Sequence, residues 1–171
     1  HAGLSIATTA LSVIGGGKVW LDNLSTAALT VSGISAGQTG PSGLLDGDVV
    51  LRSLASAITL DGDLTAAGAD GRVEIDAAGT GASLTIRNAR VKAATVVFDS
   101  NLQLLTADSG RVEASRLEFQ TFLGAGVGAA AAPFLIDLQG DSASVTGRIA
   151  GSLDLRESSG TLGLDRLEVG V

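Results

Sequence analysis

The chain has 171 residues, a net charge of −7, no cysteine and a single histidine. Lysine and arginine never cluster, so a nucleic-acid partner has little electrostatic support, and without cysteine a disulfide framework, a thiolate zinc site and thiol catalysis are excluded. Hydrophobic residues make up 45% of the chain and aromatic residues only 3%, with 24 glycines. These proportions suit thin, repetitive β layers better than one thick core.

The N-terminal segment begins at His1 without a methionine, which indicates a mature chain after signal removal or an excised piece. Residues 2–14 are weakly polar and rich in threonine, so we expect an exposed edge strand there. Further along, glycine, serine and proline predict a loop over residues 35–43. No stretch of about 18 or more apolar residues occurs, so we expect no transmembrane helix.

Aliphatic and polar residues alternate at every second position in residues 72–76, 83–87 and 153–156. Such alternation predicts strands with one buried face and one wet face. Turn signals separate the predicted strands, namely Gly15-Gly16-Gly17, Asp46-Gly47, Asp61-Gly62, Asp70-Gly71, Ser109-Gly110, Gly140-Asp141 and Ser159-Gly160. We therefore predict an all-β fold of many short strands over residues 1–171, as one domain or as a segment of a longer repetitive protein. A parallel β-helix (solenoid) is the first choice, and an antiparallel β-sandwich or open β-groove is the alternative.

Imperfect internal repeats support a repetitive architecture. Leu45-Asp46-Gly47-Asp48-Val49 is similar to Leu60-Asp61-Gly62-Asp63-Leu64, and a glycine–basic–aliphatic unit recurs at Gly71, Gly110 and Gly147. Their spacing drifts. Either loops are inserted into some coils, or the units share only the chemistry of a strand that follows a turn.

Residues 124–133 depart from the strand pattern, because three glycines precede four alanines and Pro133. This composition predicts a loop of small residues or one short helical turn closed by the proline. The segment lacks the lysine of a phosphate-binding loop and the glycine spacing of a dinucleotide fingerprint. We therefore expect no cofactor there.

Catalytic residue types are scarce. His1 is the only histidine, which rules out a site built from several histidines or from histidine and cysteine. Only Lys18 and Lys92 could act as the base for a serine or threonine nucleophile, and no Ser-x-x-Lys motif occurs. We expect the protein not to be an enzyme.

Four carboxylates stand in pairs around turn glycines, Asp46 with Asp48 and Asp61 with Asp63. Asp-Gly is a common turn dipeptide, so we favour a structural turn over paired-carboxylate catalysis. Calcium binding is the alternative, because two acidic turns stacked in successive coils could converge on one hard cation. The glycine-rich nonapeptide of calcium-binding β-rolls is absent.

The aromatic residues are expected to fill the core. Trp20 is the candidate for exposure, because it stands near the end of a short predicted strand. The set comprises Trp20, Phe98, Phe119, Phe122 and Phe134.

Residues 58–68, 71–79 and 89–100 resemble the repeats of filamentous-haemagglutinin-type exoproteins and autotransporter passengers. The resemblance covers roughly residues 17–120 and consists of strand pattern and composition. It implies a parallel β-helix, a secreted or cell-surface location, and adhesion or filament building through self-association or a cell-surface partner. It implies no functional residue, because these repeats have no catalytic signature.

The C-terminal part carries a second resemblance. Residues 145–156 and 160–169 are similar to strands of AsmA-like envelope proteins, whose β-grooves carry lipid between membranes. This implies a periplasmic lipid-binding groove as the alternative function. A polysaccharide-active β-helix enzyme is a third hypothesis, and it would need several carboxylates and an arginine in one cleft.

Overall fold

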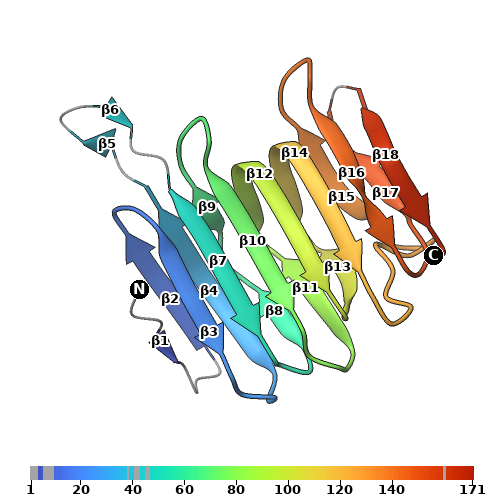
Figure 1. Cartoon of the computed structure of the whole chain (residues 1–171), viewed down its shortest axis with the longest axis horizontal. Coiled ribbons are helices and arrows are strands. Elements are labelled where there is room, and N and C mark those ends of the chain that lie inside the picture. The colour runs from blue at the N-terminus through green and yellow to red at the C-terminus, as the bar shows by residue number, and fades with distance from the viewer. Residues whose placement is uncertain (1–3, 6–9, 38, 41–42, 45–46, 160) are drawn as a thin grey trace.

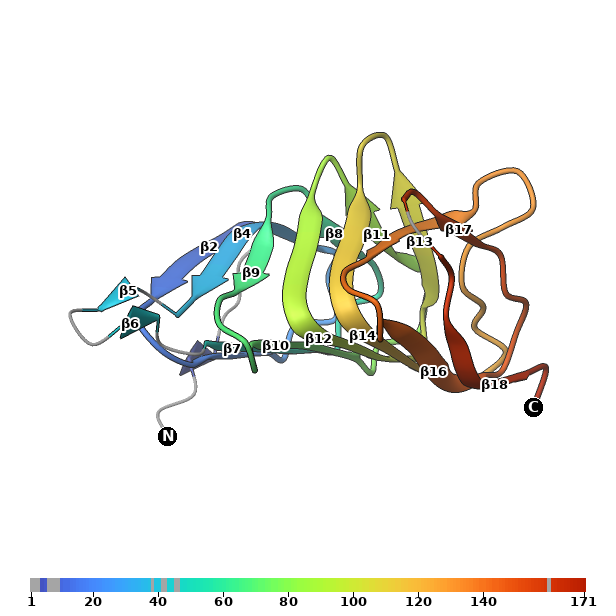
Figure 2. The ribbon, with the colours of Figure 1, turned by 90° about the horizontal axis from the view of Figure 1, so that it is seen from above.

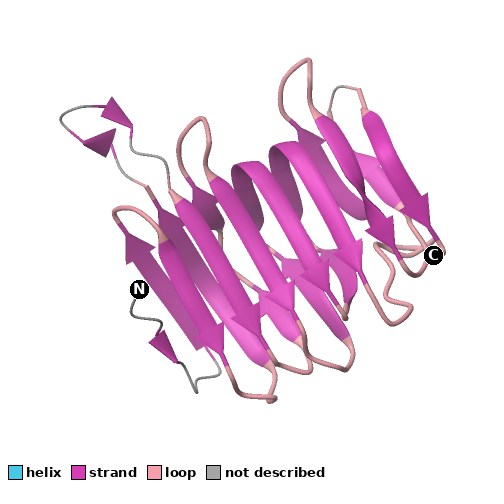
Figure 3. Cartoon of the chain, in the orientation of Figure 1, coloured by secondary structure: helices cyan, strands magenta, loops and turns pink. Residues whose placement is uncertain are grey.

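The computed structural model describes residues 4–5, 10–37, 39–40, 43–44, 47–159 and 161–171. These residues form strands, turns and loops, and no helix is found among them (Figure 3). The predicted all-β class is confirmed, and nothing in this part of the chain could cross a membrane as a helix. The strands are β1 (Leu4–Ser5), β2 (Ala10–Gly15), β3 (Val19–Asn23), β4 (Leu29–Ala36), β5 (Thr39–Gly40), β6 (Gly43–Leu44), β7 (Asp48–Ser53), β8 (Ile58–Leu60), β9 (Leu64–Ala66), β10 (Arg72–Ala77), β11 (Ser83–Arg87), β12 (Arg90–Ser100), β13 (Gln103–Ala107), β14 (Arg111–Thr121), β15 (Phe134–Leu138), β16 (Ser144–Ile149), β17 (Leu155–Glu157) and β18 (Leu164–Val169).

The chain winds into a parallel β-solenoid of about six turns, with β3 near one end of the solenoid and β18 at the other (Figures 1 and 2). Wall A joins β1, β3, β7, β10, the second halves of β12 and β14, β16 and β18. Wall B joins the start of β4 with β8, β11 and β13. Wall C joins the end of β4, β9, the first parts of β12 and β14, and β15. Parallel pairing confirms the solenoid, and among the named strands only β5 and β6 pair antiparallel.

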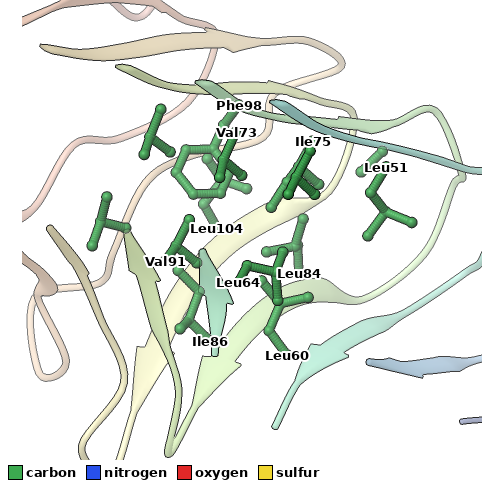
Figure 4. Packing of buried hydrophobic residues seen from close by; sticks show 14 of the residues in the cluster. Leu51, Leu60, Leu64, Val73, Ile75, Leu84, Ile86, Val91, Phe98 and Leu104 are labelled. Carbon is green, nitrogen blue, oxygen red and sulfur yellow. The ribbon is translucent and has the colours of Figure 1, made fainter. Parts of the chain in front are cut away.

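The parallel strands pair in register, so similar residues of successive coils lie above one another in each wall. In wall A, Leu21, Leu51, Ile75, Phe98 and Phe119 occupy one inward column. Inward side chains of the three walls meet in a single continuous cluster (Figure 4). Each large side chain removed from water contributes about 1.5–3 kcal/mol, so this interior column is the main source of stability.

Buried polar side chains close the corner between wall A and wall B. Asn23, Ser53, Ser100 and Thr121 end their strands in one register column and are all buried. Ser53 Oγ accepts hydrogen bonds from Asn23 Nδ2 at 3.0 Å and from the backbone N–H of Ala55 at 3.1 Å. A buried backbone group needs a partner where the strand ladder stops, and these side chains supply one.

The segment 35–43 is only partly a loop. Ser35 and Ala36 end β4 and pair with β9. Thr39–Gly40 and Gly43–Leu44 form the antiparallel pair β5–β6, which is drawn beyond the end of β4 in Figure 1. The predicted loop was therefore too long at its start, because Ser35 and Ala36 complete a coil. Residues 38, 41 and 42 lie outside the described part of the chain.

The segment 124–133 forms a loop without a helical turn. Val127 is fully buried and bridges in parallel to Leu104 on one side and Leu153 on the other. Val127 thereby extends wall B by one residue. The small glycine and alanine residues beside it leave room for this close approach.

The internal repeats do not mark the coil. Val49 lies on wall A, whereas Leu64 in the similar unit lies on wall C. Val73 and Val112, which follow two of the glycine–basic units, are divided in the same way. Successive residues of the inward column from Leu21 to Phe119 are 21 to 30 positions apart. The repeats therefore reflect turn chemistry, which was one of the two interpretations left open by their drifting spacing.

Candidate functional site

The acidic turn at Asp61 and Asp63 is paired with two arginines of the next coil. Asp61 accepts two hydrogen bonds from Arg87, Nε to Oδ1 at 3.2 Å and Nη2 to Oδ2 at 2.9 Å. Asp63 accepts the backbone N–H of Arg90 at 2.8 Å and its Nη2 at 3.3 Å. The hydrogen bond from Arg87 lowers the pKa of Asp61, an effect only partly opposed by desolvation. The motif therefore joins consecutive coils.

The second acidic turn lies elsewhere on the solenoid. Asp48 begins β7 on wall A and forms an ion pair with Lys18, while Asp46 lies outside the described residues. The structure does not bring Asp48 together with Asp61 or Asp63, which stand at the corner between walls B and C. Among the described residues, no group of three or more histidine, aspartate or glutamate side chains is placed to hold a metal ion.

The two lysines considered as bases act as counter-charges on the surface. Lys18 pairs with Asp48. Lys92 Nζ lies 3.7 Å from Oε2 of Glu113. The buried carboxylate of Glu113 also forms an ion pair with Arg111, whose Nη2 lies 2.8 Å from Oε1. His1 lies outside the described residues. The described part of the chain thus places both lysines in ion pairs on walls A and C.

A column of polar residues follows the outer face of wall A near the ends of its strands. Asp22, Arg52, Asp76, Asp99 and Gln120 are consecutive in register. Arg52 Nε lies 3.8 Å from Asp76 Oδ2, an ion pair that bridges two coils. Asp99 comes next, between Asp76 and the neutral Gln120.

Neither Asp22 nor Asp99 forms an ion pair among the described residues, but Asp22 accepts a hydrogen bond from Trp20 Nε1 at 3.2 Å. Desolvation raises the pKa of Asp99, and the negative charges of Asp76 and Glu74 raise it further. The column therefore presents uncompensated negative charge at β12. The sequence carries no local signal for this site, because its members lie on different coils and share no motif.

Large apolar side chains stand exposed at the corner where the strands of wall A end. Leu24 is 65% exposed, Leu54 42%, Phe122 40% and Leu123 77%. Leu123 also has a φ of 54°, a left-handed conformation that is unfavourable for leucine. Exposed large apolar residues are common singly, but a row of them along one corner indicates a contact surface.

Three open hollows follow this corner from β3 to the C-terminus. Their volumes are about 210, 440 and 250 Å³. The first two share Asp76 and Ala78, and the last two share Phe122 and Leu123. They form one surface along the solenoid axis, and we call it the corner trough. Its principal lining residues are Asp22, Leu24, Arg52, Leu54, Asp76, Ala78, Asp99, Gln120, Phe122, Leu123, Arg148, Ala150 and Val171.

A short sequence signal marks the apolar side of the corner trough. A buried polar residue that closes the corner is followed at once by a large apolar residue in Asn23-Leu24, Ser53-Leu54 and Thr121-Phe122. The first residue of each pair points inward, so the second is turned to the outside. The acidic side has no such signal.

The aromatic residues divide between core and surface. Phe98, Phe119 and Phe134 are buried with ring centroids 5.8 to 5.9 Å apart, as expected for core residues. The expectation was wrong for Phe122, which lines the corner trough. Trp20 is 39% exposed, as considered for it from its position near a strand end. The guanidinium of Arg52 lies over its ring, 4.7 Å from the ring centroid.

Comparison with protein-family models, with curated proteins and with solved structures gave no match to this chain.

Proposed function

We propose that this chain is a non-catalytic structural or adhesive scaffold, secreted or on the cell surface, as its resemblance to haemagglutinin-type exoproteins implies. The observation that carries the proposal is the single hydrophobic cluster that extends through the coils from Val19 to Ile149. An unbroken core under continuous parallel ladders makes an elongated, self-supporting body, the form that repeat proteins use to present extended surfaces.

Self-association is part of this proposal. β18 pairs with β16 on one side only, and its other edge meets no described strand. Leu164 and Val169 of β18 are exposed. An open strand edge with apolar side chains can take another strand, and a second copy of the chain is one source of such a strand.

The test is the assembly state over a range of protein concentrations, measured by light scattering after size exclusion and by electron microscopy. We expect larger species at higher concentration. Val169→Lys should weaken their formation, while Ser142→Lys, which adds the same charge at an exposed turn residue, should not. A strictly monomeric chain would remove the filament part of the proposal.

The adhesive part is tested separately with beads coated with the chain and layered on cultured cells. Attachment above that of beads coated with an unrelated acidic protein is the expected result. A chain that neither assembles nor attaches would overturn the scaffold proposal. Lipid recovered from the purified protein, detected by mass spectrometry of an organic extract, would favour the lipid-groove alternative instead.

A further inference from the structure

The corner trough combines two properties that one kind of ligand would satisfy together. Large apolar side chains line it at two levels, Leu54 just after β7 and Phe122 and Leu123 just after β14. Between these levels its acidic side carries Asp76 on β10 and Asp99 on β12. The order along the solenoid axis is therefore apolar, acidic, acidic, apolar.

The charge of the trough is incompletely balanced at its centre. Arg52 stands on the β7 side of Asp76, 3.8 Å from its carboxylate. On the other side, Asp99 is followed by the neutral Gln120 and only then by Arg148, which pairs with Glu168. Glu74 on β10, although paired with Arg72, adds a further negative charge near Asp99. Desolvation raises the pKa of Asp99, and the negative charges of Asp76 and Glu74 raise it further. A cation beside Asp99 would stabilise its ionised carboxylate.

The spacing of these groups is set by the solenoid. Parallel strands are about 4.8 Å apart, so the three steps from β7 to β14 cover about 14 Å. Successive same-side residues of an extended peptide are about 6.6 Å apart, so three of them cover about 13 Å. An extended segment with the pattern apolar–x–basic–x–apolar thus matches the order and the length of the trough.

We infer that the corner trough binds an extended polypeptide segment of this pattern, with its lysine or arginine beside Asp76 and Asp99 and its apolar side chains on Leu54 and on Phe122 and Leu123. A small cation would leave the apolar side chains uncovered, and an anionic lipid surface would be repelled by the carboxylates. This inference goes beyond the scaffold function. A solenoid whose trough binds nothing would still be a scaffold, so the two proposals fail separately.

The probe is a fluorescein-labelled peptide of sequence Gly-Leu-Ser-Lys-Ser-Leu-Gly, titrated with the full chain and followed by fluorescence anisotropy. Three control peptides carry glutamate for lysine, serine for both leucines, or the same residues reordered as Gly-Lys-Ser-Leu-Ser-Leu-Gly, so that the pattern is basic–x–apolar–x–apolar. Binding of the first peptide with loss of affinity in the other three is expected, because both the charge and its position matter.

Variants of the chain separate the trough from general attraction to an acidic protein. Asp99→Asn should weaken binding about two- to fivefold, the range for one exposed ion pair. Asp141→Asn removes the same charge from an exposed turn away from the trough and should leave binding unchanged. Phe122→Ser should weaken binding as well, with circular dichroism to show that each variant is folded.

Nuclear magnetic resonance of the unmodified chain locates the peptide without any substitution. Amide signals of Asp76, Asp99 and Phe122 should shift on addition of the probe, while that of Thr59 on the outer face of wall B should stay in place. The inference is overturned if the probe does not bind, if the glutamate peptide binds equally well, if Asp141→Asn weakens binding as much as Asp99→Asn, or if the shifts lie outside the trough.

Discussion

The ring of Phe98 lies over the ring of Phe119 from the next coil, with centroids 5.9 Å apart and planes inclined by 15° (Figure 4 shows Phe98 within the core). Phe134 meets both rings edge-on. We predict that Phe119→Ala lowers the free energy of unfolding by about 3–5 kcal/mol, because it removes a buried ring and leaves a cavity. Phe122→Ala, which truncates an exposed ring, should cost far less in the same urea titration. Equal losses would show that the stack is not a main support of the core.

A glycine at a close approach between coils gives the second prediction. A Cβ atom at Gly62 would overlap the carbonyl oxygen of Ser32 in the preceding coil. Gly62→Ala should therefore destabilise the fold by about 1–3 kcal/mol, as overpacking does. Gly17→Ala is the control, because nothing lies within 4 Å of the added atom. The midpoint of thermal unfolding should be measured for both variants. An unchanged midpoint for Gly62→Ala would contradict the close approach of Gly62 to Ser32.

The buried polar residues at the corner between wall A and wall B give the third prediction. Ser53→Ala removes the acceptor of two hydrogen bonds, from Asn23 and from the backbone of Ala55, in a buried position. Leaving these donors unpaired should cost about 1–3 kcal/mol. Exposed Ser142→Ala should stay close to the unmodified chain in denaturant titrations. Hydrogen exchange at the Ala55 amide should also speed up in Ser53→Ala, and an unchanged rate would argue against the corner function of this hydroxyl.

Asp99 gives a prediction for pH dependence. The folded chain raises the pKa of Asp99 by desolvation and by the nearby carboxylates of Asp76 and Glu74, above the ordinary value of 3.8. The unfolded chain therefore loses this proton first as the pH rises, and the ionised group opposes folding at neutral pH. Asp99→Asn should raise the melting temperature at neutral pH, and the gain should shrink as the pH falls toward 3.8. If the rise in melting temperature caused by Asp99→Asn became larger as the pH falls, the pKa of Asp99 would not be raised by folding.

Calcium provides the fifth prediction. Asp61 and Asp63 are held by Arg87 and Arg90, and a divalent cation would have to displace these guanidinium groups. We expect the melting temperature to be the same in millimolar calcium and in a chelator. A calcium-dependent rise would show that the acidic turns bind the ion after all.

Local patterns explain how much of the architecture could be predicted. Alternation in residues 72–76 and 83–87 indicated strands with one buried face, and both segments are such strands, β10 and β11. The same reasoning missed the exposure of Phe122, because an aromatic residue next to a strand end has no periodicity that says which side it faces. It also placed a loop over Ser35 and Ala36, which pair with β9.

Composition and period-two alternation were enough to determine an all-β fold without thiol or multi-histidine chemistry, because strand formation and side-chain alternation depend on near neighbours in the chain. The partners of each strand were decided only in three dimensions. Val49 and Leu64 follow similar Asp-Gly-Asp turns yet lie on different walls, and Asp61 meets Arg87 across 26 positions. Because the coils differ in length, a repeat of fixed period in the sequence cannot predict these strand registers. The corner trough exists only once winding brings Leu54, Asp99 and Phe122 to a common corner.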